Sequence, residues 1–432
     1  MQKRGHRKTK KVTKSGIRYI KVQRYKCIKC NLSFTAHKKG HKQTSFSPSY
    51  KEEIAKRHIE DRTGYRDIDR RDENISRNTA CQIVNKFALN VKPAWLMTKK
   101  LKPKSSGKLC TDGKFVYIKC EKEGVERFTK KGKRNPAYYQ CCYYHGIDYE
   151  TRDMPHYDLY ESESQQAMDQ YYEDLRRSGY DLQVLIRDGR DEAQVGAENA
   201  YGKPIIGQLC HKHFMDTICE EYLKIQGVIK YRQYLLDRLR SNKKDHTVWD
   251  SVINRKVIKT SKQIKAQLRN IRQRYYFELE IYDFLRRLFA AGDYDKLVTV
   301  IVPKFYKCLN RYGKVRCYSK ITDRIEKKFF KEFDYLFSYL KYPKLEIPRY
   351  NNLSENYNQQ LDLRLKSIRG FESFETGRGE LILLTTRRRF MKYTDCSGPY
   401  KHLNGYAPLE LSGVDVSSID WLKFSQKTTR VL

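Results

Sequence analysis

Residues Asn351–Phe371 have the sequence NNLSENYNQQLDLRLKSIRGF, and they decide how the rest of the chain is interpreted. The stretch opens with a polar turn that can cap a helix, and it continues as a predicted helix as far as Gly370. Leu361, Leu365 and Ile368 follow one another at spacings of four and three, which predicts one apolar stripe along that helix.

Glu355 lies in the first turn of this predicted helix, four residues before Gln359 on the same face. A carboxylate that is flanked by amides and followed by basic residues can hold a divalent cation beside a phosphodiester. Taken alone, the stretch is better explained by an exposed helix with a glutamate in its capping turn, and the rest of the chain reverses that preference. The basic residues off the apolar stripe are predicted to bind such phosphate groups: Arg364, Lys366 and Arg369.

The composition points to a polyanionic partner. The chain has 432 residues, enough for two to four domains, and its 88 Lys and Arg against 51 Asp and Glu give a net charge of +37 spread over its whole length. Nucleic acid is favoured over an anionic membrane surface, because no apolar run approaches the roughly 20 residues of a membrane span. The basic start lacks the apolar core of a signal peptide, and the 12 cysteines show no disulfide-like spacing. These features predict a reducing compartment, either the nucleoid or cytoplasm or, in a eukaryotic host, the nucleus.

Residues 1–45 are strongly basic and contain Cys27 and Cys30 in a CxxC pair, which is half of a zinc ribbon. Two metal-related interpretations stay open. Either His37 and His41 complete an unusual Zn²⁺ site, or the first ligand pair is missing because this chain starts late, which would leave the ribbon malformed or metal-free. The second is favoured over the first, and a third interpretation gives the two cysteines no metal role at all.

Residues 46–91 predict two or three short helices, the last of them capped by Ser76. A turn before a basic, capped helix is typical of a helix-turn-helix domain, whose last helix enters a major groove. Arg77 and Asn78 are then the candidates for base contacts. Residues 92–107 carry two prolines and a Lys-, Ser- and Gly-containing end, so they are interpreted as a linker.

From residue 108 the apolar period changes to two. Three strands, a helix and the buried strand Leu182–Ile186 follow, which is an α/β pattern. The first strand is predicted to end or kink at Asp112, and Asp188 follows the buried strand, where the chemistry of such sheets gathers. Residues 214–345 are predicted to be helical and are strongly basic, with one long amphipathic helix around Ile264–Leu279.

Three carboxylates stand out, namely Asp112, Asp188 and Glu355. If they are grouped, they repel one another unless cations occupy the site. Two divalent ions, Mg²⁺ or Mn²⁺, would there activate a water or a 3′-hydroxyl and stabilise the leaving oxygen of an in-line displacement at phosphorus. The glycine after each aspartate would leave room for backbone to approach the substrate. Each Asp-Gly alone is better explained as a turn, but the combination in so basic a chain favours the metal site.

At this point the sequence resembles the DDE-type transposases of insertion sequences, in the group allied to Mutator-like elements, over nearly all of the chain. The motif around Glu355 is the most specific, because both its asparagine-rich start and the K-x-x-R-G-F that follows it fit. The motifs are T-D-G at 111–113, I-R-D-G at 186–189, Q-L-C-H-K-H at 208–213, N-N-L-S-E-N-Y-N at 351–358 and K-S-I-R-G-F at 366–371.

The resemblance implies an RNase H-like mixed-sheet core with an all-helical insertion, with Asp112, Asp188 and Glu355 as catalytic metal ligands. It also implies double-stranded DNA partners, namely the terminal inverted repeats of the element and a target. The protein would bind them as a homodimer or a larger assembly, and no membrane partner is expected. The expected parts are a zinc-ribbon-like segment (1–45), a helix-turn-helix domain (46–91), a linker (92–107), the first part of the core (108–213), the insertion (214–345) and the second part of the core with the tail (346–432).

Cys210 and His213 match the C-x-x-H signature that such enzymes carry after the second aspartate. Packing or positioning of the DNA strand is expected of them rather than Zn²⁺ binding, because two ligands do not make a metal site. His211 is expected to be incidental. Two other functions stay open: a domesticated DNA-binding protein without catalysis, and a nuclease with the same core that does not transfer strands.

Overall fold

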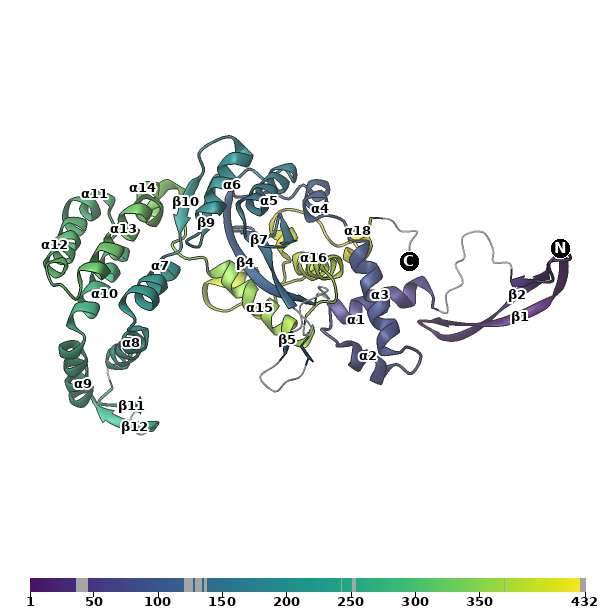
Figure 1. Cartoon of the computed structure of the whole chain (residues 1–432), viewed down its shortest axis with the longest axis horizontal. Coiled ribbons are helices and arrows are strands. Elements are labelled where there is room, and N and C mark those ends of the chain that lie inside the picture. The colour runs from purple at the N-terminus through teal and green to yellow at the C-terminus, as the bar shows by residue number, and fades with distance from the viewer. Residues whose placement is uncertain are drawn as a thin grey trace. The chain divides into compact units, whose positions relative to one another are not determined.

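This computed structural model of the chain describes residues 1–35, 46–119, 127–128, 134–135, 138–241, 243–250, 254–368 and 370–427. The chain divides into two compact units, and each is described by itself (Figure 1). The first unit comprises Met1–Leu182, Val195–Lys203 and Asn352–Leu432, and the second comprises Gln183–Gln194 and Pro204–Asn351.

A five-stranded mixed sheet has the strand order β10-β9-β4-β7-β8. β4 and β7 pair antiparallel, β8 pairs antiparallel with β7, and β9 and β10 pair parallel. This order is consistent with the predicted RNase H-like core, and the predicted mixed α/β class is confirmed. The strands are β4 (Lys108–Lys119), β7 (Tyr138–Asp148), β8 (Tyr157–Tyr160), β9 (Val184–Arg187) and β10 (Ile206–Leu209).

β4 does not end or kink at Asp112, contrary to the prediction. Its pairing with β7 is continuous from Leu109 to Lys119. A Cβ atom added at Gly113 would collide with Oε1 of Glu163 and lie 2.9 Å from Sγ of Cys142. This glycine is therefore needed within a strand, because side chains pack directly against its backbone, and it forms no turn.

The helices of residues 46–91 form as predicted, and the Oγ atom of Ser76 accepts a hydrogen bond from the backbone N–H of Thr79. They do not form a separate domain, because they share one apolar core with β4 and β7. A Cβ atom added at Gly379 would collide with the carbonyl oxygen of Ala88, so the backbones of two helices touch there. These helices are α1 (Pro48–Ile59), α2 (Tyr65–Arg71), α3 (Arg77–Leu89), α15 (Asn352–Ile368) and α16 (Phe374–Phe390).

Half of the predicted linker is a packed helix, α4 (Ala94–Leu101). Ala94, Met97 and Thr98 are buried, and the hydroxyl of Thr98 donates a 2.7 Å hydrogen bond to the carbonyl of Pro155. Two of the lysines, Lys99 and Lys100, lie on the exposed side of this helix. The remaining elements of the first unit are α5 (Gln165–Arg177), β5 (Arg127–Phe128), β6 (Arg134–Asn135), η4 (Gly398–Leu403), α17 (Pro408–Leu411) and α18 (Trp421–Ser425), and α6 (Asp191–Tyr201) contributes its second half.

The N-terminal sheet is antiparallel and consists of β1 (Gln2–Thr13), β2 (Gly16–Lys26) and β3 (Ser33–Thr35). Cys27 and Cys30 lie in the turn between β2 and β3, where backbone hydrogen bonds from Cys30 lower the pKa of the Cys27 thiol. Within the described ranges no third ligand joins this pair, and His37 and His41 lie outside the described residues. The zinc ribbon therefore stays a prediction.

The second unit is mostly helical, but not entirely as predicted. A hairpin of β11 (Asp245–Asp250) and β12 (Arg255–Thr260) interrupts it. The predicted long helix is two helices, because the chain breaks at Tyr275 between α9 (Ser261–Arg274) and α10 (Tyr276–Phe289). The other helices are α7 (His211–Thr217), η1 (Ile218–Leu223), α8 (Gln226–Arg240), α11 (Tyr294–Lys296), η2 (Leu297–Ile301), α12 (Val302–Gly313), α13 (Ser319–Leu336), α14 (Ser338–Lys341) and η3 (Pro343–Leu345).

Two buried histidines make the first unit sensitive to acid. Burial lowers the pKa of His145 and of His156 to about 3, against about 6.5 in an unfolded chain. Between these two values the unfolded chain binds protons that the folded chain does not. Each histidine therefore costs roughly 1.4 kcal/mol of folding stability per pH unit as the pH falls from 6.5 toward 3.

Replacing His145 with leucine should reduce the loss of stability on acidification. Between pH 7 and pH 5 the variant should lose roughly 2 kcal/mol less than the parent, which can be measured as a smaller fall in melting temperature. His402→Leu is the matched control, because His402 is exposed, and it should keep the parental pH dependence. An unchanged pH dependence in His145→Leu would contradict the assignment.

Candidate active site

Asp112 and the turn that carries Glu355 are held together within the first unit. Asp112 lies on β4, and the hydroxyl of Ser354 at the start of α15 donates a 3.0 Å hydrogen bond to the carbonyl of Cys110. Nδ2 of Asn358 donates a 2.7 Å hydrogen bond to Oδ2 of Asp112. Glu355 lies between these two anchors in the first turn of α15, and its side chain, like that of Asp112, is half-buried.

From the sequence, Ser354 was expected only as a possible helix cap, and Asn358 had no expected role of its own. Both are buried, and they lie four residues apart, so they share one face of α15. This spacing, on either side of Glu355, was the available signal. The polar residues at the start of the Asn351–Phe371 stretch therefore form the surface of α15 that binds β4. The predicted apolar stripe is confirmed, with Leu361 buried and Leu365 and Ile368 packed against the core.

A second group of polar side chains forms in the second unit. Arg187 of β9 pairs with Leu209 of parallel β10, so the next residues, Asp188 and Cys210, follow the carboxyl ends of neighbouring strands. His213 lies one turn into α7, and its Nδ1 atom is 2.9 Å from Oδ1 of Asp188. The potential ligand atoms of Asp188, Cys210 and His213 all lie within 4.8 Å of one another, so this group could hold a metal ion.

The electrostatics of this group are strongly coupled. Hydrogen bonds to Asp188 and to Cys210 raise the pKa of His213 to about 11. The backbone N–H of Asn351 donates to Sγ of Cys210 at 3.4 Å. His211 is not part of the group. Its ring stacks on Phe289 in the core of the second unit, with centroids 4.2 Å apart.

The structure thus brings together two sets of predicted residues. In the first unit Asp112 lies beside the helix turn that carries Glu355. In the second unit Asp188 lies beside Cys210 and His213. The grouping of all three carboxylates at one site stays a prediction.

Arg364 is not placed to bind phosphate, contrary to the prediction. Its side chain is buried, and Nη2 donates a 2.7 Å hydrogen bond to the carbonyl of His58 on α1. Burial lowers the pKa of this guanidinium, and the ring of His58 in turn contacts Glu380. The sequence placed Arg364 off the apolar stripe of α15, but His58 of α1 contacts its guanidinium there.

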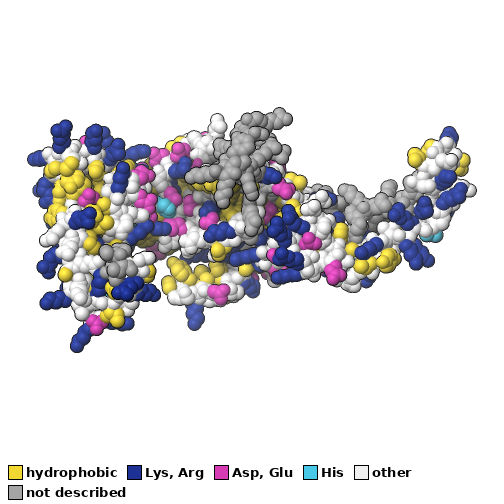
Figure 2. All heavy atoms as spheres, turned by 60° about the horizontal axis from the view of Figure 1, so that its bottom comes forward, with side chains coloured by type: hydrophobic (Ala, Val, Ile, Leu, Met, Phe, Trp, Pro, Cys, Tyr) yellow, Lys and Arg dark blue, Asp and Glu magenta, His cyan; other side chains and the backbone are white. Residues whose placement is uncertain are grey.

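The other predicted DNA contacts remain open. Arg77 and Asn78 are exposed at the start of α3, and Lys366 is exposed near the end of α15. Arg369 lies outside the described residues. Figure 2 shows Lys and Arg side chains in dark blue on both units, in keeping with the net charge of +37. In the described part of the chain, no helix is both long and apolar enough to cross a membrane.

Comparisons with known proteins find likenesses among solved structures alone. No protein-family model matches this chain, and no curated protein matches it. Among solved structures the chain is similar to one described as "Drosophila P element transposase strand transfer complex", with 13% sequence identity and a TM-score of 0.30. That match covers 91% of this chain and 95% of the other. A TM-score of this size does not establish a shared fold.

Proposed function

We propose that this chain is a DDE-type transposase, a metal-dependent enzyme that cuts DNA at the ends of its own element and joins the 3′-hydroxyls to a target. The observation that carries the proposal is the hydrogen-bonded contact between α15 and β4. Ser354 and Asn358 anchor the helix at Cys110 and Asp112, and so they hold the turn of Glu355 at the strand of Asp112. A site for two hard metal ions requires grouped carboxylate oxygens, and this contact between strand and helix would supply two of the carboxylates.

Asp112, Asp188 and Glu355 are the proposed ligands of two Mg²⁺ or Mn²⁺ ions. Carboxylate oxygens suit these ions, and partly exposed side chains leave room for a substrate. The ions would activate a water or a 3′-hydroxyl and stabilise the leaving oxygen. Asn358 would fix the orientation of Asp112, because its amide already holds one carboxylate oxygen.

The proposed DNA contacts follow the exposed basic and polar side chains. Arg77 and Asn78 at the start of α3 would read the terminal inverted repeats, and Lys366 and Arg369 would bind phosphates. Residues 1–45, with Zn²⁺ at Cys27 and Cys30 as a further proposal, would assist this binding. The enzyme would work as a homodimer or a larger assembly on paired ends, and its affinity for DNA would fall steeply with salt.

The direct test uses labelled duplexes copied from the DNA that flanks the coding sequence of this protein. In Mg²⁺ the protein should nick these ends, expose 3′-hydroxyls and join them to a second duplex, and chelation of the metal should abolish all three steps. Denaturing gels separate the products. Tight binding without cleavage would favour the domesticated DNA-binding protein, and cleavage without joining would favour the nuclease.

A further inference from the structure

We propose that Asp188, Cys210 and His213 form a site for a Zn²⁺-class ion, and that an ion bound there withdraws Asp188 from the catalytic carboxylates and inhibits the enzyme. The site itself follows from the geometry of the second unit. The inhibition rests on the proposed function, because it needs Asp188 to be a ligand of Mg²⁺ or Mn²⁺.

Three rigid elements place the ligands. The register of β9 and β10 sets Asp188 beside Cys210, and the backbone N–H of Cys210 donates a 2.9 Å hydrogen bond to the carbonyl of Arg187. His213 follows at the spacing of one turn of α7. The ligand atoms lie within 4.8 Å of one another, whereas the ligands of a tetrahedral Zn²⁺ ion are roughly 3 to 4 Å apart. Small rotations of the side chains would therefore suffice to bind an ion.

The ligand types select the ion. A thiolate and an imidazole favour Zn²⁺ and similar ions, whereas Mg²⁺ and Mn²⁺ prefer an all-oxygen set. Three protein ligands leave the fourth tetrahedral position open for water. The backbone N–H of Asn351, which donates to Sγ of Cys210, would support a thiolate there.

The exposure of the group permits exchange with solvent. Cys210 is buried, whereas the side chains of His213 and Asp188 are 34% and 29% exposed. An ion could therefore reach the site from the side of His213 and Asp188. Because Asp188 cannot fully serve two differently placed ions, occupation by Zn²⁺ would compete with the hard-metal site.

Cobalt absorption tests the site without any need for activity. The full-length chain should carry Cys27→Ser and Cys30→Ser, so that the exposed CxxC pair contributes no thiolate. Titration with Co²⁺ should then give a thiolate-to-cobalt charge-transfer band. Cys210→Ser should remove this band, and His213→Gln should weaken Co²⁺ binding roughly tenfold or more. Cys219→Ser is the matched control, because Cys219 is also a buried cysteine of the second unit, and it should keep the band. Absence of the band, or a band that survives Cys210→Ser, would overturn the site.

Release of Mn²⁺ tests the inhibition. Bound Mn²⁺ is measured by electron paramagnetic resonance of the protein–DNA complex while Zn²⁺ is added. Zn²⁺ should displace Mn²⁺ from the chain with Cys210 intact at concentrations at least about tenfold lower than from Cys210→Ser. Equal displacement from both would overturn the inhibition and leave the site itself to the Co²⁺ result. Absence of any bound Mn²⁺ would count against the proposed catalytic site, and with it the inhibition, whereas the Co²⁺ titration would still decide the Zn²⁺-class site.

Discussion

Replacing Glu355 with glutamine should reduce DNA cleavage and joining by about 10³-fold or more, while DNA binding stays intact. Glutamine keeps the size of the side chain but removes the negative charge that a hard divalent ion needs. The fold around it should persist, because Ser354 and Asn358 still anchor α15 to β4 in the variant. Single-turnover cleavage rates and gel-shift affinities measure the two properties separately.

Glu375→Gln is the matched control for this experiment. Glu375 also lies in the first turn of a helix, α16, but it is exposed, so its replacement should leave cleavage unchanged. Asp112→Asn and Asp188→Asn should each reproduce the Glu355→Gln defect. Equal cleavage by the parent and by Glu355→Gln would mean that the catalytic glutamate is a different residue.

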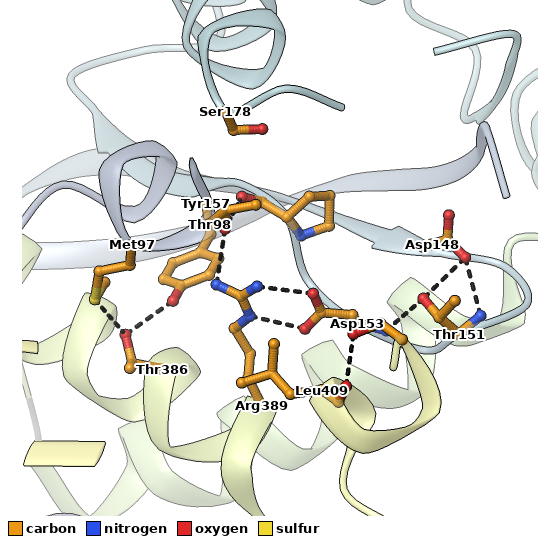
Figure 3. A network of polar contacts seen from close by, with 12 residues as sticks. Met97, Thr98, Asp148, Thr151, Asp153, Tyr157, Ser178, Thr386, Arg389 and Leu409 are labelled. Atoms are coloured by element: carbon orange, nitrogen blue, oxygen red, sulfur yellow. Dashed lines mark hydrogen bonds and ion pairs between the residues drawn. The ribbon is translucent and has the colours of Figure 1, made fainter. Parts of the chain in front are cut away.

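A buried ion pair controls the stability of the first unit (Figure 3). Nε and Nη2 of Arg389 each donate a 2.7 Å hydrogen bond to Asp153, and Nη1 donates to the hydroxyl of Thr98 at 2.8 Å. The side chains of Arg389 and Asp153 are 1% and 3% exposed. Burial alone would lower the pKa of Arg389, but the charge of Asp153 outweighs it and raises that pKa above its ordinary value.

Asp153→Asn should destabilise the first unit by about 3 to 5 kcal/mol, because it leaves the guanidinium of Arg389 buried without its counter-ion. For a unit of this size the melting temperature should fall by on the order of 10 °C. Glu173→Gln is the matched control. It breaks the exposed contact between Glu173 and Arg176 on α5, and it should cost less than about 1 kcal/mol. Similar losses in both variants would show that the buried pair has no special role.

The sequence by itself determined part of the local structure of this protein. Side chains a few residues apart produced the cap at Ser76 and the apolar stripe of α15, because those patterns depend only on neighbours along the chain. The strand β7 was likewise predicted from its own residues, although it is buried continuously from Cys141 to Asp148 and does not alternate. Of the candidate active site, the sequence supplied the carboxylates and the C-x-x-H pair as separate motifs.

Only the tertiary structure decided which faces are covered and which motifs meet. Arg364 is buried and bonded to His58 of α1, and α4 is a packed helix because it contacts α5, β8 and α16. Asp188 joins Cys210 and His213 because β9 and β10 are parallel neighbours in a fixed register. Burial and pairing depend on contacts between segments far apart in the chain, and no pattern of neighbouring residues contains that information.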